Sequence, residues 1–481
     1  MPKSAVRPGA PKASTARRRG RATPGTTRLG LPGARPRWWH TIAMFGPAFV
    51  ASIAYVDPGN VAANLTSGAQ YGYLLVWVLV LANAMAVLIQ YQSAKLGIVT
   101  GQTLPEHVGA RTRPWGRRAY WVQAEIVAAA TDIAEVLGGA IALNLLFGVP
   151  LVMGGVIVGI VSMVLLLVQN ARRQRTFELM IMGLLAVIAF GFLAGVFVSH
   201  VDWFAAADGL VPRFEGAPTV LLAASMLGAT VMPHAIYLHS ALARDRHHVE
   251  FAAHAERTDF TGDSLRPRGE EQSATEAPGA PVQPSSSRIA SPTRLRLLLR
   301  ATRGDVVIAL LLAGAVNIAM LLLAASSLRG VDGTDTIPGA YVAIQSALGP
   351  TIATIFAVGL LASGLASTSV GAYAGSVIMK GLLRIRVPVV ARRVVTLIPA
   401  LIVLGVGIDP TWALVLSQVL LSIGIPFALI PLIRLTGDRT LMGEFADRMP
   451  VRIIAWTVVA LIVALNVVLI FLTVTGAGVA A

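Results

Sequence analysis

Eleven apolar stretches, each of about 18 residues or more, follow one another along this chain of 481 residues. A helix of this length can cross the hydrocarbon core of a membrane. Hydrophobic residues make up 55% of the chain, charged residues only 13%, and the mean hydropathy is +0.70, which excludes an ordinary soluble globular protein. The sequence therefore predicts an all-α polytopic membrane protein with 11 transmembrane helices, at residues 43–69, 73–97, 119–146, 150–169, 177–199, 218–241, 305–328, 350–379, 391–408, 411–433 and 453–475.

The net charge of +15 is distributed according to this topology. If the N-terminus is cytoplasmic, 37 of the 39 Lys and Arg residues lie in or beside cytoplasmic segments, and only Arg213 and Arg329 fall elsewhere. Such a distribution is the positive-inside pattern of proteins in the cytoplasmic membrane, and it explains the basic balance without a nucleic-acid partner. The odd number of spans then predicts an extracytoplasmic C-terminus.

Two polar segments lie outside the predicted spans. Residues 1–41 contain no acidic residue and no apolar signal core, so we predict a disordered basic cytoplasmic tail beside the anionic inner leaflet, with an organellar transit peptide as the alternative. Residues 245–303 are predicted to form a disordered cytoplasmic loop, because the stretch 273–291 is rich in Ser, Pro and Ala. Transmembrane helices 1–6 then occupy residues 42–244, and helices 7–11 occupy residues 304–481.

Proline interrupts two of the predicted spans at matching places. Asp-Pro-Gly-Asn at residues 57–60 breaks the first span, and Met-Pro-His at residues 232–234 breaks the sixth. A broken helix frees backbone carbonyls, which must be buried in protein or line a polar cavity. Matching breaks in two halves of a membrane protein indicate the substrate site of a transporter.

The groups beside the breaks can hold a metal ion. Asp57 brings a carboxylate and Asn60 an amide oxygen, while Ala229 offers a freed carbonyl and Met232 a thioether. Oxygen ligands alone suit Mg²⁺ or Ca²⁺, whereas a soft thioether favours the later transition metals. Gln418 is a weaker candidate for a further oxygen ligand. The alternatives are an interhelical hydrogen-bonded pair for Asp57 and plain packing for Met232.

Four carboxylates are found inside the predicted spans, where each charge costs about 2.5–3.5 kcal/mol. Besides Asp57 they are Glu125, Asp132 and Glu135, which share one polar face, about 15 Å long, of the third span. Such a chain indicates a proton relay, and structural salt bridges to Arg or Lys are the alternative. His234 could titrate near neutral pH beside the second break, or act as a structural hydrogen-bonding group.

Three motifs carry a resemblance to a known family: GPAFVASIAYVDPGN at Gly46–Asn60, AEIVAAATDIAE at Ala124–Glu135, and GATVMPHAIYLHS at Gly228–Ser240. Together they resemble the Nramp family of proton-coupled divalent-metal transporters, in its bacterial manganese and iron branch. Further matches lie at Gly101–His107, Leu143–Leu151, Ser417–Leu432 and Leu441–Phe445. The resemblance implies a LeuT-like fold with a 5+5 inverted repeat, discontinuous helices 1 and 6, and a peripheral eleventh helix.

The resemblance also implies roles for individual residues. The family's metal ligands fall on Asp57, Asn60, the Ala229 carbonyl and Met232. Its proton route falls on Asp57, Glu125, Asp132, Glu135 and His234, with Arg246, Arg392 and Arg393 as basic partners. The implied function is proton-coupled uptake of Mn²⁺ and Fe²⁺ by alternating access. Metal ions and protons are then transported substrates, no cofactor is expected, and the lipid bilayer is the surrounding partner.

Two other classes of function are alternatives. A symporter of amino acids or other organic solutes would also use broken helices, but Asp57 would repel a substrate carboxylate. A membrane enzyme is not expected, because the chain has neither an HExxH metal motif nor a GxSxG nucleophile motif. The chain also has no cysteine, which excludes disulfides and thiolate metal sites.

Overall fold

The computed structural model describes residues 46–168, 174–246, 292–334, 336–385 and 388–475. The predicted tail 1–41 and residues 247–291 of the predicted loop lie outside these ranges. The described part is helical and contains no strand. Its elements are α2 (Pro47–Ser52), η1 (Ile53–Val56), α3 (Pro58–Tyr71), α4 (Val76–Thr100), α5 (Leu104–Arg111), α6 (Pro114–Phe147), α7 (Leu151–Val168), α8 (Gln174–Val198), α9 (Trp203–Asp208), α10 (Gly216–Thr230), helical residues 233–246, α12 (Pro292–Ser327), α13 (Ile337–Leu348), α14 (Pro350–Leu383), α15 (Val389–Val406), α16 (Pro410–Thr436), α17 (Arg439–Met442), η3 (Gly443–Phe445) and α18 (Met449–Thr475).

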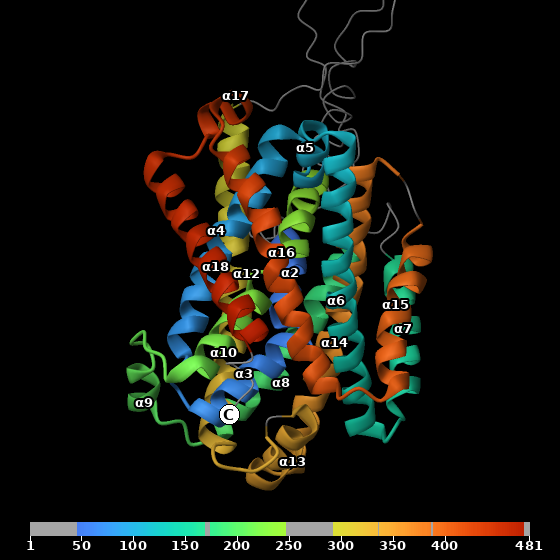
Figure 1. Cartoon of the computed structure of the whole chain (residues 1–481), viewed down its shortest axis with the longest axis vertical. Coiled ribbons are helices and arrows are strands. Elements are labelled where there is room, and N and C mark those ends of the chain that lie inside the picture. The colour runs from blue at the N-terminus through green and yellow to red at the C-terminus, as the bar shows by residue number, and fades with distance from the viewer. Residues whose placement is uncertain (1–45, 169–173, 247–291, 335, 386–387, 476–481) are drawn as a thin grey trace, which may run out of the picture. The chain divides into compact units, whose positions relative to one another are not determined.

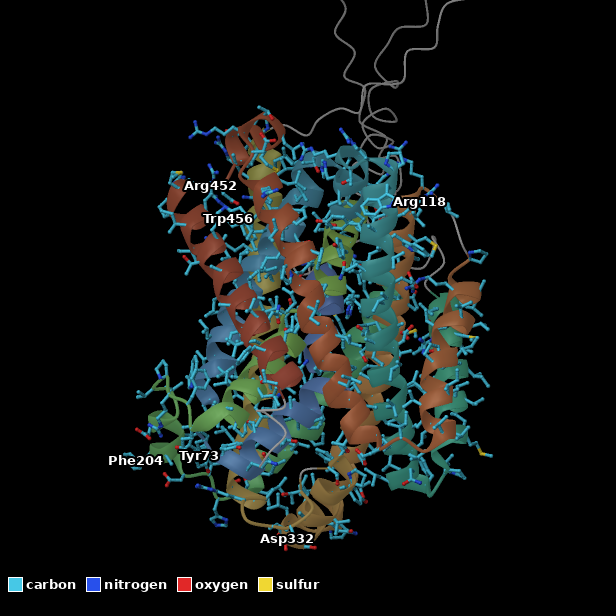
Figure 2. The ribbon with its side chains drawn as sticks, viewed as in Figure 1. Tyr73, Arg118, Phe204, Asp332, Arg452 and Trp456 are labelled. Carbon is cyan, nitrogen blue, oxygen red and sulfur yellow. The ribbon has the colours of Figure 1, made fainter. Side chains whose placement is uncertain are left out.

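The long helices run side by side, with α5 and α17 at one end of the bundle and α9 and α13 at the other (Figure 1). Arg118 and Arg452 lie towards the first end, and Phe204 and Asp332 towards the second (Figure 2). Within the described ranges, eight helices are long and apolar enough to cross a membrane. Shorter apolar helices cover residues 47–56, 151–167 and 337–348, so the number of 11 crossing helices stays a prediction.

The prediction of disorder is wrong for the last part of the loop 245–303. Helix α12 begins at Pro292, so residues 292–303 are helical. Leu295, Leu298 and Leu299 occupy one face of this extension and are buried against α4. The arginines of the extension lower its hydropathy, and a search for apolar stretches therefore detects only the part of the helix that follows.

The two predicted breaks are present. Asp57 has an extended backbone (φ −76°, ψ 167°) between η1 and α3. Its carboxylate accepts a hydrogen bond from the Asn60 backbone N–H at 2.9 Å, which caps α3, and Pro58 follows at the first helical position. In the second break α10 ends at Thr230, and the helix resumes at residue 233. Discontinuous first and sixth spans are thus confirmed.

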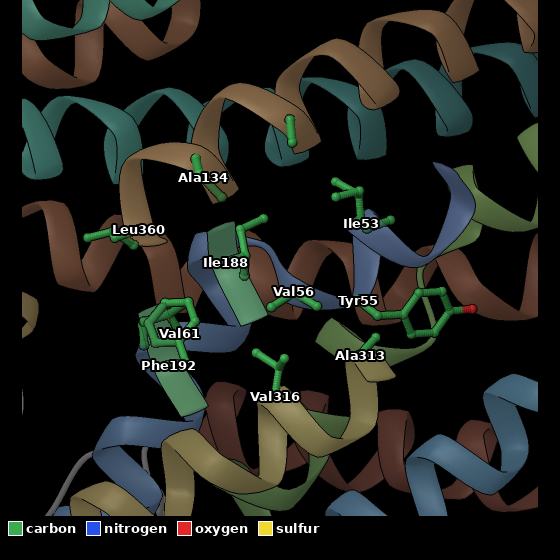
Figure 3. Close-up of a cluster of buried hydrophobic side chains, with 14 of the residues drawn as sticks. Ile53, Tyr55, Val56, Val61, Ala134, Ile188, Phe192, Ala313, Val316 and Leu360 are labelled. Carbon is green, nitrogen blue, oxygen red and sulfur yellow. The ribbon is translucent and has the colours of Figure 1, made fainter. Parts of the chain in front are cut away.

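A cluster of buried hydrophobic side chains surrounds the first break (Figure 3). The members drawn near the break come from η1, α3, α6, α8, α12 and α14, and include Ile53, Val56, Val61, Ala134, Ile188, Phe192, Val316 and Leu360. Helix α6 can approach the break because Gly138 has no side chain: a Cβ there would lie 2.1 Å from the Cβ of Pro58. The break is therefore enclosed in protein, as its freed backbone groups require.

Candidate metal site

Side-chain and backbone groups from the two breaks meet at Asn60. Its side-chain amide donates to Asp57 Oδ1 at 2.6 Å and to the Ala229 carbonyl at 3.0 Å. The Thr230 hydroxyl donates to Asn60 Oδ1 at 3.4 Å. Asp57 and Asn60 are fully buried. Three of the predicted ligand residues thus lie together, with the partial positive charge of the amide between two oxygens that would suit a cation.

Gln418 and Met232 complete the predicted set. A Cβ on Gly59 would lie 1.6 Å from Gln418 Nε2 and 3.1 Å from Asp57 Oδ2, so the Gln418 side chain lies directly over the first break. Asp57 Oδ2 and Gln418 Oε1 are buried without a hydrogen-bond partner among the described residues. Met232 is fully buried in the hydrophobic cluster around the first break. This position is consistent with packing and with coordination alike.

The freed carbonyls of the first break are capped by helices far away in sequence. Asn317 of α12 donates to the Tyr55 carbonyl at 2.7 Å and accepts from the Asn64 amide at 2.9 Å. Ser363 of α14 donates to the Val56 carbonyl. Neither residue is recognisable from the sequence, because a single polar residue in a long helix gives no sign of which carbonyl it faces.

Two of the three carboxylates on α6 form ion pairs with α15. Glu125 lies 2.8 Å from Arg392, and Asp132 lies 2.8 Å from Arg393. Asp132 and both arginines are buried, while Glu125 is partly exposed. The arginines therefore face the carboxylates with which the resemblance associates them. A structural role and a role in proton transfer are both compatible with this geometry.

Glu135 and His234 have no such partner. Both oxygens of Glu135 and both ring nitrogens of His234 are buried without a hydrogen bond to any described residue. His234 interacts electrostatically with Asp132 and Arg392, so it belongs to the same charged group. Unpaired buried polar groups are costly, and they are therefore typical of functional sites.

Arg246 contacts the carboxylate of Glu178 on α8 at 2.5 Å. Nearby, Asp305 of α12 accepts hydrogen bonds from the backbone N–H groups of Gly46 and Ala48, at the N-terminus of α2. Glu178 and Asp305 are both buried. The count of four carboxylates within spans was therefore too low. Glu178 and Asp305 stand at the very start of their predicted spans, where a charged residue is easily assigned to the flanking loop.

A further buried polar chain was also missed. Gln90 of α4 donates to the Tyr55 hydroxyl at 2.6 Å, and its carbonyl oxygen lies 2.8 Å from His239 Nδ1. All three side chains are buried. A glutamine in mid-span was the available signal, since polar residues inside spans are expected to find partners on neighbouring helices.

Few charged groups are gathered at the two breaks. Within the described ranges, no group of three or more His, Cys, Asp or Glu side chains could hold a metal ion. The groups gathered at the breaks are instead one carboxylate with neutral oxygens and a nearby thioether.

Comparison with known proteins identifies the family. The sequence profile described as Nramp, natural resistance-associated macrophage protein-like, matches residues 48–472. The chain belongs to the Nramp family. A relative from Mycobacterium tuberculosis (strain CDC 1551 / Oshkosh), named divalent metal cation transporter MntH, is 55% identical over 433 residues, which cover 90% of this chain and 92% of the relative. A multi-pass membrane protein follows from this membership and from the eight apolar helices.

Solved structures agree on the architecture of this Nramp protein. The manganese transporter of Eremococcus coleocola, solved with an aromatic bis-isothiourea compound, superposes with a TM-score of 0.75 at 29% identity, over 91% of this chain and 88% of that one. Mhp1, a nucleobase-cation-symport-1 family transporter, superposes with a TM-score of 0.52 at 15% identity, over 89% of each chain. The latter likeness concerns the fold alone, and it supports the LeuT-like architecture.

Proposed function

We propose that this chain carries divalent transition-metal ions, Mn²⁺ and also Fe²⁺, into the cell in symport with protons. The observation that carries the proposal is the meeting of the two breaks: one Asn60 amide bridges the Asp57 carboxylate and the Ala229 carbonyl. Family membership and the names of the relatives support a divalent metal as the substrate. The thioether of Met232 favours transition metals over Ca²⁺ and Mg²⁺.

In the proposed cycle the ion sheds most of its water and is held by Asp57, Asn60, the Ala229 carbonyl and Met232, with Gln418 beside them. Rotation of the Asn60 amide by half a turn would present its oxygen in place of the NH₂ group. The half-helices beside the breaks then rock relative to one another, so that the site opens to one side of the membrane at a time. A membrane potential that is negative inside favours entry by about 2.3 kcal/mol per charge per 100 mV.

Protons would follow a separate route through the carboxylates of α6. Glu135 lies close enough to Asp57 and to Asp132 to interact electrostatically with each of them. Arg393 and Arg392 provide positive charge opposite Asp132 and Glu125. A proton released near the metal can therefore move along acidic groups that are not metal ligands. For orientation, we propose a cytoplasmic N-terminus and an extracytoplasmic C-terminus from the distribution of Lys and Arg.

The test is Mn²⁺ uptake into proteoliposomes with simultaneous recording of internal pH. Asp57→Ala should reduce both Mn²⁺ uptake and the accompanying proton influx to the level of empty vesicles. Asp208→Ala is the matched control, because Asp208 is exposed at the end of α9 and pairs only with Arg213 among the described residues. Uptake by this control should match that of the wild type.

Asp57→Asn serves as a second variant if Asp57→Ala does not fold, since an asparagine still caps α3. Undiminished Mn²⁺ uptake by a folded Asp57 variant would overturn the site. Uptake that amino acids suppress and metal ions do not would overturn the substrate.

A further inference from the structure

Four small residues of α14, each four positions after the last, form one stripe that faces the polar groups of the bundle. They are Ser363, Ser367, Gly371 and Gly375, and all four are buried. Ser363 donates to the Val56 carbonyl in the first break. A Cβ at Gly375 would lie 2.0 Å from the guanidinium carbon of Arg392, so this arginine crosses the stripe at its other end.

Glu135 meets the same stripe at Gly371. A Cβ at Gly371 would lie 3.2 Å and 3.3 Å from the two carboxylate oxygens. Glu135 is fully buried, and neither oxygen has a hydrogen-bond partner among the described residues. An unpaired buried carboxyl group is expensive, so its position against α14 requires an explanation beyond packing.

Ser367 is the stripe residue between the first break and Glu135. Its hydroxyl donates to the Ser363 carbonyl at 2.8 Å, which leaves its oxygen lone pairs for a second donor. Glu135 lies against Gly371, one turn further along α14, and within reach of the Ser367 side chain. Rotation about the Cα–Cβ bond would turn the hydroxyl hydrogen towards it. One hydroxyl can thus serve both forms of a neighbouring carboxyl group.

We propose that Ser367 is a positioning residue of the proton path, which holds Glu135 in place in both of its protonation states. The protonated carboxyl donates its O–H to Ser367 Oγ, and the ionised carboxylate accepts the rotated Ser367 O–H. The serine gains and loses no proton: each proton that Glu135 takes from one acidic neighbour passes to another. This inference rests on the proton coupling proposed above.

The test compares Ser367→Ala with the wild type in proteoliposomes loaded with a pH dye, under one inward proton gradient and saturating Mn²⁺. Loss of a hydrogen bond to a charged group is expected to reduce proton influx by about tenfold or more. Mn²⁺ uptake should stay within about twofold, because the hydrogen bonds described for the Ser367 hydroxyl go to carbonyls of its own helix, at Ser363 and Gly364, and not to the proposed metal ligands. A merely structural defect would reduce both fluxes together.

Ser369→Ala is the matched control. Ser369 makes the same kind of bond, to the Leu365 carbonyl at 2.9 Å, but lies off the stripe. This control should keep the wild-type ratio of protons to Mn²⁺, and Ser367→Thr, which keeps the hydroxyl, should restore it. If Ser367→Ala does not fold, Gly371→Ala gives the same test, because its added methyl group presses on the Glu135 carboxylate.

Three results would count against the inference. An unchanged ratio in the Ser367→Ala and Gly371→Ala variants would overturn the role of Ser367 and leave the proposed function standing. An equal loss in Ser369→Ala would show that the effect is not specific to the stripe. Wild-type Mn²⁺ uptake without any proton movement would overturn the coupling itself, and the role of Ser367 with it.

Discussion

The two helix breaks look alike in sequence but are held in different ways. In the first, side chains of two long helices cap the freed carbonyls: Asn317 of α12 binds the Tyr55 carbonyl, and Ser363 of α14 binds the Val56 carbonyl. In the second, the Ala229 carbonyl accepts from Asn60, which itself belongs to the first break. The carbonyls of the first break are therefore hydrogen-bonded to neighbouring helices, whereas the Ala229 carbonyl of the second break is hydrogen-bonded to a residue of the first.

The helix after the second break is held mainly further along its length. Ser93 of α4 donates to the Ile236 carbonyl at 2.6 Å. Near the end of this helix, Arg244 pairs with Glu106 of α5, and Arg246 pairs with Glu178 of α8. We therefore expect the hard ligand Asp57 to keep its position, while Ala229 and Met232 move relative to it as the site opens.

The largest effect should come from releasing the first break. Asn317→Leu leaves the Tyr55 carbonyl and the Asn64 amide without partners in a buried place. Loss of groups that orient metal ligands typically weakens binding 10- to 100-fold, and we expect a loss of about that size in Mn²⁺ affinity. Isothermal titration calorimetry of purified protein measures it.

Ser93→Ala is the matching variant for the second break, because it removes one hydrogen bond, to the Ile236 carbonyl, from the helix that follows that break. It should weaken Mn²⁺ binding by no more than about threefold, the value of a single ordinary hydrogen bond between membrane helices. Equal losses in the two variants would contradict the difference between the breaks.

How much of this could be read from the sequence depends on whether a residue breaks a local rule. Proline interrupts a helix and a carboxylate is costly in an apolar span, so both breaks and Asp57 are recognisable from the sequence. Asn317 and Ser363 violate little, since isolated Asn and Ser occur in many helices. Their importance lies in facing a carbonyl from a distant segment, and only the tertiary structure sets that.

The two unpaired groups beside the breaks follow the same logic. His234 and Glu135 were candidates because each is a titratable residue in an apolar segment. For Glu135 the lack of hydrogen-bond partners could not be predicted, because the residue of α14 that faces its carboxylate is Gly371, which has no side chain. A glycine marks only that a side chain is missing, not which group uses the space.

A smaller effect is expected at the second break, where it distinguishes coordination by the Met232 sulfur from packing of its side chain. Met232→Ala removes the thioether, and Ca²⁺ should then compete with Mn²⁺ about tenfold better, because oxygen ligands alone do not favour transition metals. Competition between Mn²⁺ and Ca²⁺ in the uptake assay measures this. Met226→Ala is the control, since Met226 is equally buried on α10 but precedes the break. If both variants shift the preference alike, the sulfur acts through packing only.

The smallest effect is expected from the ion pair near the end of the helix that follows the second break. Arg244 Nη1 donates to both oxygens of Glu106, at 3.0 and 2.8 Å, and Glu106 also caps α5 through Thr103. Burial would raise the pKa of Glu106, but the hydrogen bond from the Thr103 backbone and the charge of Arg244 outweigh it and hold this pKa below its usual value.

A carboxyl group with a lowered pKa stabilises the folded state fully above its usual pKa, and the contribution disappears as pH falls through the lowered value. Glu106→Gln should therefore reduce the free energy of unfolding by about 0.2–1 kcal/mol at neutral pH, and the difference from wild type should vanish in acid. Thermal unfolding in detergent across this pH range measures it. Glu444→Gln removes a more exposed ion pair, with Arg296, and should change less. If the loss of stability in Glu106→Gln persists in acid, the helix that follows the second break is held there by packing rather than by the charge of Glu106.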